Sequence, residues 1–145
     1  MCIRDSPNIV GIKGASGDLE LGKNIIKQTE SDFVVLSGDD DSCFELCALG
    51  ARGVVSVISH LLGKEMKAFL HKVIQNKKGN ILKEYKEKYG ELLENVYCEA
   101  NPIGIKMALK LLDIFTSAEL RSPLVALGEK ETKQLQESMR GVSLL

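Results

Sequence analysis

The chain has 145 residues, with 19 Lys and Arg against 20 Asp and Glu and a formal net charge of -1. This length supports one ordinary domain or part of a larger one. The near balance of charge argues against a dedicated nucleic-acid binder, and no apolar run approaches the roughly 18 residues that would span a bilayer. The composition, with 44% hydrophobic and 27% charged residues and no signal-peptide pattern at the start, is typical of a cytoplasmic globular protein.

One pattern occurs three times between Pro7 and about Asn76: a short β-branched apolar run, a small polar turn and a helical stretch. The apolar runs are NIVGIK, FVVL and GVVSVI, at residues 8–13, 33–36 and 53–58. Near-continuous apolar strands that alternate with helices are typical of a parallel sheet covered on both faces. Three such βα units form only part of a closed eight-stranded barrel, which takes about 250 residues.

A helix is predicted after each strand. The first covers Leu19 to about Gln28 with Asp18 as its N-cap, and the second is a short helix that follows the Asp39–Asp41 group and runs through Leu49. Acidic side chains suit both helix starts, because a carboxylate accepts hydrogen bonds from the first backbone N–H groups. The third helix follows His60, and its expected buried stripe consists of Met66, Phe69, Leu70, Val73 and Ile74.

The remainder of the chain is predicted to be helical. The pair Asn101-Pro102 predicts the start of a helix, with Asn at the N-cap and Pro at the first position. A final short helix is expected from about Glu129 to Arg140. We therefore expect a partial barrel over residues 7–76 and a helical region over 77–145. Residues 1–6 fit neither part and are treated as an extraneous start. The region 77–145 begins with one amphipathic helix, whose apolar positions are Leu82, Tyr85, Tyr89, Leu92, Leu93 and Val96.

The four cysteines, Cys2, Cys43, Cys47 and Cys98, form no CxxC pair. Cys43 and Cys47 share one helix face at i, i+4 and are interpreted as small buried hydrophobes. Zinc or a disulfide is the weaker alternative, since a structural zinc site needs four ligands in recognisable pairs. The three acids Asp39–Asp41 could suggest magnesium, but they are explained better by the preference for acids at a helix start. No metal site is predicted.

Ligands of parallel βα sheets bind beyond the carboxyl ends of the strands. Three points qualify: Lys13 with the loop 14–18, the segment 37–39, and the stretch 55–60 that ends at His60. Lys13 ends an apolar strand with neighbours that should be buried, so its amine is expected to project into the barrel mouth. Burial disfavours a charged lysine, and a neutral amine can attack a carbonyl and form a Schiff base. On position alone, a solvent-exposed lysine is the more common outcome. His60 is a candidate acid or base without an identifiable partner.

Five segments together resemble the dihydrodipicolinate synthase family in order and approximate spacing: IVGIKGASGD, VVLSGDDDS, GARGVVSVISHL, NPIGIKMALKLL and LRSPLV. The resemblance covers Pro7 to Leu145. It implies the carboxyl-terminal portion of a (β/α)8 TIM barrel, namely its last three βα units, followed by a C-terminal helical tail.

The resemblance also implies a function. Lys13 matches the lysine that forms a Schiff base with pyruvate, Val55 matches a strand residue whose backbone lies against the bound pyruvate, and Gly38 lines the same pocket. The pyruvate-derived enamine would then add to aspartate semialdehyde, in the diaminopimelate route to lysine. Family members use neither a metal nor an organic cofactor, and they suggest a homotetramer built from dimers.

Some of the family's pattern does not occur in this sequence. The proton-relay tyrosine, the threonines that bind the pyruvate carboxylate and the arginine that binds semialdehyde precede the lysine in the family, so we expect this chain to be inactive alone. His60 stands where the family commonly has Asn. A related pyruvate aldolase, such as N-acetylneuraminate lyase, shares the lysine, although the SGDD and NPIGIK segments favour the synthase. The remaining alternative is a noncatalytic βα ligand-binding module in which Lys13 is an ordinary surface lysine.

Overall fold

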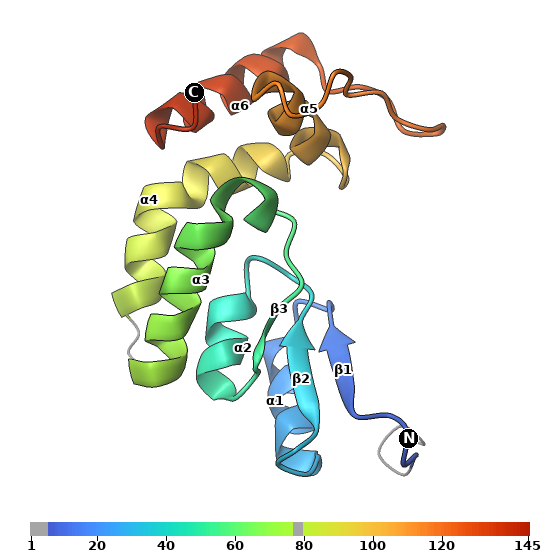
Figure 1. Ribbon diagram of the computed structural model, residues 1–145, viewed down its shortest axis with the longest axis vertical. Coiled ribbons are helices and arrows are strands. Elements are labelled where there is room, and N and C mark those ends of the chain that lie inside the picture. The colour runs from blue at the N-terminus through green and yellow to red at the C-terminus, as the bar shows by residue number, and fades with distance from the viewer. Residues whose placement is uncertain (1–5, 77–79) are drawn as a thin grey trace. The chain divides into compact units, whose positions relative to one another are not determined.

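The computed structural model describes residues 6–76 and 80–145, which form three strands and six helices (Figure 1). The chain divides into two compact units. The first runs to Ser56 and resumes from Glu65 to Leu82, and the second consists of Val57–Lys64 and Lys83–Leu145. None of the described helices is long and apolar enough to cross a membrane.

The sheet of the first unit is parallel, with its strands in the order β1 (Gly11–Gly14), β2 (Val34–Ser37) and β3 (Gly53–Val54). All three predicted strands form, but β1 begins later than expected and β3 is only two residues long. The apolar residues left outside include Val10, which is 73% exposed, and Ile9, which is 38% exposed. An apolar run indicates where a strand lies, whereas its length in the sheet depends on the partner that supplies hydrogen bonds.

The two faces of the sheet differ in burial. In β2, Val35 and Ser37 are buried, whereas Val34 and Leu36 on the other face are only half-buried. The register pairs Lys13 with Leu36 and Leu36 with Gly53. Since side chains alternate along a strand, these three residues share the less buried face. The prediction that both faces are covered is therefore wrong for the described residues, because none of them packs over this face closely enough to bury it.

The first two helices follow β1 and β2. Helix α1 (Leu19–Gln28) has the predicted bounds, and the Asp18 carboxylate caps it by accepting a hydrogen bond of 3.0 Å from the Leu21 N–H. Helix α2 (Cys43–Leu49) begins after Ser42, and no side chain caps it. The predicted cap by the Asp39–Asp41 group is wrong, because the Asp39 carboxylate instead accepts a hydrogen bond of 2.7 Å from the Ser42 hydroxyl.

Cys43 and Cys47 lie on the inner side of α2, where both are buried free thiols. Burial raises the pKa of the Cys47 thiol to about 11. Burial and the nearby Asp40 carboxylate raise the pKa of Cys43 further. Their interpretation as small buried hydrophobes is confirmed, because both side chains are buried and neither forms a disulfide. Cys2 lies outside the described residues.

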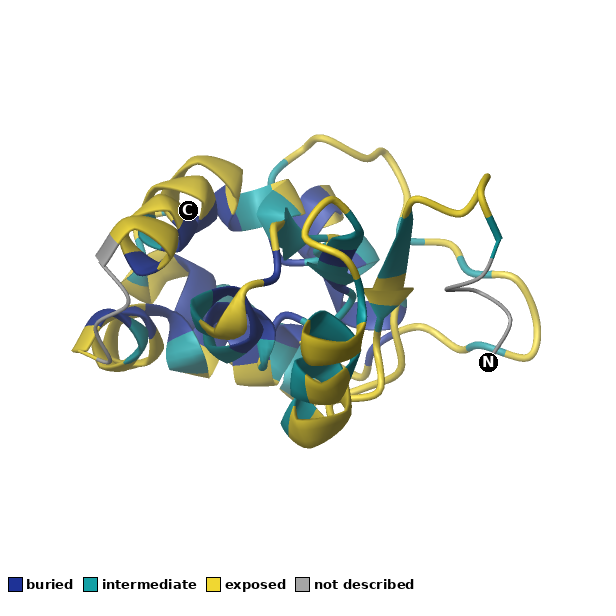
Figure 2. Cartoon of the chain, turned by 90° about the horizontal axis from the view of Figure 1, so that it is seen from below, coloured by how far each residue is buried: buried dark blue, intermediate teal, exposed yellow. Residues whose placement is uncertain are grey.

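Helix α3 (Ser59–Asn76) carries the predicted buried stripe in part. Met66, Leu70 and Val73 are buried and Phe69 is half-buried. Ile74 is 41% exposed, so its predicted burial is wrong. At 100° per residue, Ile74 lies at the margin of the stripe defined by the three buried residues. Several helices carry buried residues on one side and exposed residues on the other (Figure 2), whereas α1 has no buried residue.

The second unit is helical, with α4 (Asn80–Val96), α5 (Ile103–Leu111) and α6 (Glu129–Gly141). Helix α5 begins one residue later than predicted. Pro102 occupies the N-cap and no side chain caps the helix, so the predicted role of Asn101 as the cap is wrong. The reason is local, since the preceding turn is closed through the backbone by a 2.9 Å hydrogen bond from the Ile103 N–H to the Ala100 carbonyl.

Most of the buried apolar side chains of the second unit come from α4 after Leu82, from α5 and from α6. In α4 the rings of Tyr85 and Tyr89 lie 5.1 Å apart between centroids, and both are buried. Five of the six predicted α4 positions are buried and Leu82 is half-buried. In α6, Leu135 and Met139 are fully buried. This unit therefore has an apolar core of its own.

Candidate functional site

The carboxyl ends of the three strands lie side by side at one edge of the sheet. The Gly38 N–H donates to the Gly14 carbonyl at 2.7 Å, and the Val55 N–H donates to the Ser37 carbonyl at 2.8 Å. These two hydrogen bonds continue the ladders just beyond the strand ends. They place the segments that follow Lys13, Ser37 and Val54 next to one another, as expected for a parallel sheet.

Lys13 and Gly38 are in direct contact. A Cβ built on Gly38 would lie only 3.0 Å from Lys13 Cε and 3.2 Å from Lys13 Cδ. The methylene stem of Lys13 therefore crosses the sheet edge above the Gly38 backbone. The sequence predicted that both residues belong to one site, and the structure places them against each other.

The predicted burial of Lys13 is not found. Lys13 is exposed, and Val10, three residues earlier, is 73% exposed. Among the described residues, β1 pairs with β2 alone, and the sheet face that carries Lys13 is the less buried one. The described residues provide no surface opposite Lys13, so the expected position of its amine in a barrel mouth stays a prediction.

Val55 completes the predicted set of three. Its side chain is 50% exposed, and alternation from Gly53 places it on the face that carries Lys13. Its backbone N–H donates to the Ser37 carbonyl, and half of its side chain remains exposed. This arrangement offers an amine, a half-buried glycine and an apolar side chain at one sheet edge.

Ser37 belongs to the candidate segment 37–39, in which the sequence reasoning gave it no role of its own. It is fully buried. Its hydroxyl donates to the Asp39 carbonyl at 2.9 Å and accepts from the Asp39 N–H at 3.2 Å. The Ser37 hydroxyl thus fixes the backbone of Asp39, the residue that follows Gly38. A small polar residue directly after an apolar run was the available signal.

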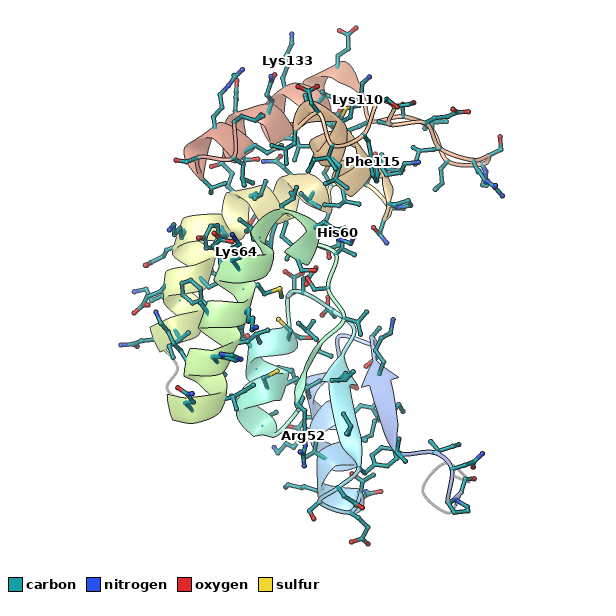
Figure 3. The ribbon with its side chains drawn as sticks, viewed as in Figure 1. Arg52, His60, Lys64, Lys110, Phe115 and Lys133 are labelled. Carbon is teal, nitrogen blue, oxygen red and sulfur yellow. The ribbon has the colours of Figure 1, made fainter. Side chains whose placement is uncertain are left out.

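His60 is exposed in the first turn of α3 (Figure 3). Its Nδ1 lies 2.9 Å from the Val57 carbonyl oxygen, so this nitrogen is engaged by the backbone of its own turn. The other ring nitrogen is the one available to a ligand. No role as acid or base follows from this geometry, and the predicted role stays a prediction.

The acids that follow β2 do not form a metal site. Asp40 is buried and Asp39 is bonded to Ser42. Among residues 6–76 and 80–145 there is no group of three or more His, Cys, Asp or Glu side chains placed to hold a metal ion.

Three parallel strands, each followed by a helix and with a lysine at the carboxyl edge, define a βα protein with its candidate site at the strand ends. Residues 3–141 match the Dihydrodipicolinate synthetase family, and the chain belongs to that family. The resemblance predicted from the five sequence segments is thereby confirmed.

The relatives show the extent of the match. The 4-hydroxy-tetrahydrodipicolinate synthase of Bdellovibrio bacteriovorus is 42% identical over 137 residues, which are 94% of this chain and 46% of the relative. The lysine-bound enzyme of Cyanidioschyzon merolae superimposes with a TM-score of 0.88 at 36% identity, covering 96% of this chain and 46% of that one. The chloride-inhibited enzyme of Acinetobacter baumannii, complexed with pyruvate, gives a TM-score of 0.87 at 33% identity over 98% of this chain and 48% of that one. The chain thus spans about half the length of the relatives it matches.

Proposed function

We propose that this chain supplies the last three βα units and the helical tail of a (β/α)8 TIM-barrel lyase. The reaction is the condensation of pyruvate with aspartate semialdehyde to 4-hydroxy-tetrahydrodipicolinate, in the diaminopimelate route to lysine. The observation that carries the proposal is the position of Lys13 at the carboxyl edge of a parallel sheet, with its stem across Gly38. The names of the relatives, and the pyruvate held by the Acinetobacter baumannii enzyme, support it.

Lys13 is the proposed nucleophile. Its neutral amine attacks C2 of pyruvate, and loss of water gives an iminium between Nζ and C2. The iminium withdraws electrons, so a base can remove a proton from the pyruvate methyl group and leave an enamine. The enamine carbon then forms a bond to the aldehyde carbon of aspartate semialdehyde, whose oxygen takes up a proton, and the iminium at C2 re-forms. The amino group of the semialdehyde attacks C2, closes the ring and releases the Lys13 amine. The iminium performs the electron-withdrawing role for which other enzymes use a cofactor, and we propose that neither a metal nor an organic cofactor takes part.

Gly38 and Val55 are the proposed pyruvate-binding residues. A ligand on Lys13 lies beside the sheet face on which Val55 is half exposed, and an apolar side chain suits a methyl group. The backbone at Gly38 has no side chain to compete for the same space. Both residues lie in the same compact unit as Lys13.

The 145-residue chain is proposed to be inactive alone. The resemblance places the proton-relay tyrosine, the carboxylate-binding threonines and the semialdehyde-binding arginine outside residues 7–145. Catalytic groups that act as a unit lose nearly all activity when one is removed. The complete protein is proposed to be a cytoplasmic homotetramer built from dimers.

A chimera tests the proposal, with residues 7–145 of this chain replacing the matched half of the Bdellovibrio bacteriovorus relative. We expect it to consume pyruvate and aspartate semialdehyde together, and we expect Lys13→Ala to abolish turnover. Lys23→Ala is the matched control, because Lys23 lies on α1 and forms a 2.9 Å ion pair with Glu20 away from the strand ends.

The same chimera separates the alternatives. Turnover of N-acetylneuraminate in place of aspartate semialdehyde would assign a different pyruvate aldolase. A folded chimera that neither turns over substrate nor traps pyruvate on borohydride reduction would leave the noncatalytic module as the correct description.

A further inference from the structure

The side chains of Lys13 and Ala15, at the end of β1 and in the loop after it, both lie close to Gly38. A Cβ built there would lie 2.7 Å from the Ala15 Cβ and 3.0 Å from Lys13 Cε. The first separation is shorter than real Cβ contacts, and the second is at the lower limit of what they show. Both neighbours would therefore have to move if position 38 carried a side chain.

The two neighbours would respond differently. Ala15 is fixed to its backbone through Cβ, so it can move only with the loop after β1. Lys13 Cε is near the end of a flexible stem and can rotate away at little cost. A side chain at position 38 would thus affect stability mainly through Ala15, and the position of the amine mainly through Lys13.

Hydrogen bonds at Gly38 and at both of its chain neighbours hold this part of the backbone in place. The Gly38 N–H is bonded to the Gly14 carbonyl at 2.7 Å, and the preceding carbonyl of Ser37 accepts from the Val55 N–H at 2.8 Å. After Gly38, the Asp39 backbone is bonded through both its carbonyl and its N–H to the buried Ser37 hydroxyl. The displacement therefore falls mainly on the Lys13 stem and on the loop that carries Ala15.

We propose that Gly38 is a positioning residue for Lys13: the missing side chain lets the lysine stem lie across the end of β2 and so determines where the amine meets pyruvate. This inference rests on the proposed function, in which that amine is the nucleophile. It gives Gly38 a role that acts through Lys13, separate from any contact with pyruvate.

The rate of borohydride trapping with pyruvate in the chimera measures this role. Gly38→Ala is expected to slow trapping at saturating pyruvate by about 100-fold, the scale expected when a reacting group is displaced by about 1 Å. The pyruvate concentration that gives half the maximal rate should change little. Gly63→Ala is the matched control, because a Cβ there meets nothing within 4 Å and Gly63 lies on α3, outside the three candidate segments. It should trap at close to the unmodified rate.

The double variant Ala15→Gly/Gly38→Ala separates positioning from stability. Removing the Ala15 methyl relieves the shorter contact, so the thermal midpoint should recover. The lysine stem remains displaced, so trapping should stay slow. Recovery of the trapping rate together with the midpoint would overturn the inference, as would Gly38→Ala trapping at the unmodified rate.

Two further results keep the inference separate from the proposed function. If the unmodified chimera folds and traps no pyruvate, the proposed function fails before Gly38 is in question. If the Gly38 variants do not fold, a crystal structure of the unmodified chimera decides: Lys13 Cε packed on Gly38 supports the inference, and a Lys13 stem directed away from Gly38 overturns it.

Discussion

Lys13 and Gly38 show how much of the site could be predicted from single residues. A lysine at the end of an apolar run, and a Ser-Gly-Asp turn after the next run, were enough to place both residues at one sheet edge. The contact between them was not predictable, because it depends on the register that sets Lys13 opposite Leu36. The hydrogen bonds between the Ser37 hydroxyl and the Asp39 backbone were not predicted, because a serine that bonds within its own turn leaves no spacing pattern in the sequence.

The buried thiol of Cys47 makes the stability of the folded chain depend on pH. Burial raises the pKa of this thiol from 9.0 to about 11, so between these values the folded chain keeps a proton that the unfolded chain has lost. The stability that Cys47 contributes is therefore complete below pH 9 and is lost as pH rises through 11. We expect Cys47→Ala to flatten the fall of the thermal midpoint between about pH 9 and pH 11.

Cys98→Ala is the control for this pH effect. Cys98 is an exposed thiol of the second unit, so its removal should alter the slope less. Equal slopes for Cys47→Ala and the unmodified chain would show that burial of Cys47 does not contribute to this pH dependence.

The elements differ in how well the sequence predicted them. Helix α1 has its predicted bounds, because its apolar period and the Asp18 cap are both local signals. The bounds of β1 and β3 differ from the predicted ones, because an apolar run does not indicate which of its residues pair with a neighbouring strand. Helix α5 shifted by one residue, since its first turn is closed by backbone bonds where a side-chain cap was expected.

The junction of α4 and α5 yields a prediction at the scale of elements. A Cβ on Gly104 would overlap the Val96 carbonyl at the end of α4, and a backbone atom cannot rotate away. We expect Gly104→Ala to destabilise the chain by about 1–3 kcal/mol in chemical denaturation.

Gly90→Ala, within α4, is the matched control for Gly104. Its Cβ would meet nothing within 4 Å, and alanine favours a helix interior over glycine by about 0.5–1 kcal/mol. The two substitutions should therefore have opposite signs. A Gly104→Ala variant as stable as Gly90→Ala would show that α4 and α5 do not meet closely at this point.

At the scale of the whole molecule, the exposed apolar residues of the first unit predict self-association. Val10 is 73% exposed and Val55 is 50% exposed, and along its outer side β1 pairs with none of the described strands. An uncovered strand edge pairs readily with another chain. We expect residues 7–145 expressed alone to associate, with an apparent mass in light scattering that rises with concentration.

Val10→Lys is the matched variant for this prediction. A lysine at a strand edge opposes edge-to-edge pairing, so it should lower the apparent mass. A monodisperse monomer with cooperative unfolding for the unmodified chain would contradict the expectation.

The central claim is that the Lys13 amine captures a keto acid, and peptide mapping of the chimera after borohydride reduction with pyruvate tests it most directly. The account predicts one reduced pyruvate per chain, carried on Lys13 and lost in Lys13→Ala but retained in Lys23→Ala. A label on another lysine, or an equal label in the Lys13→Ala variant, would contradict it.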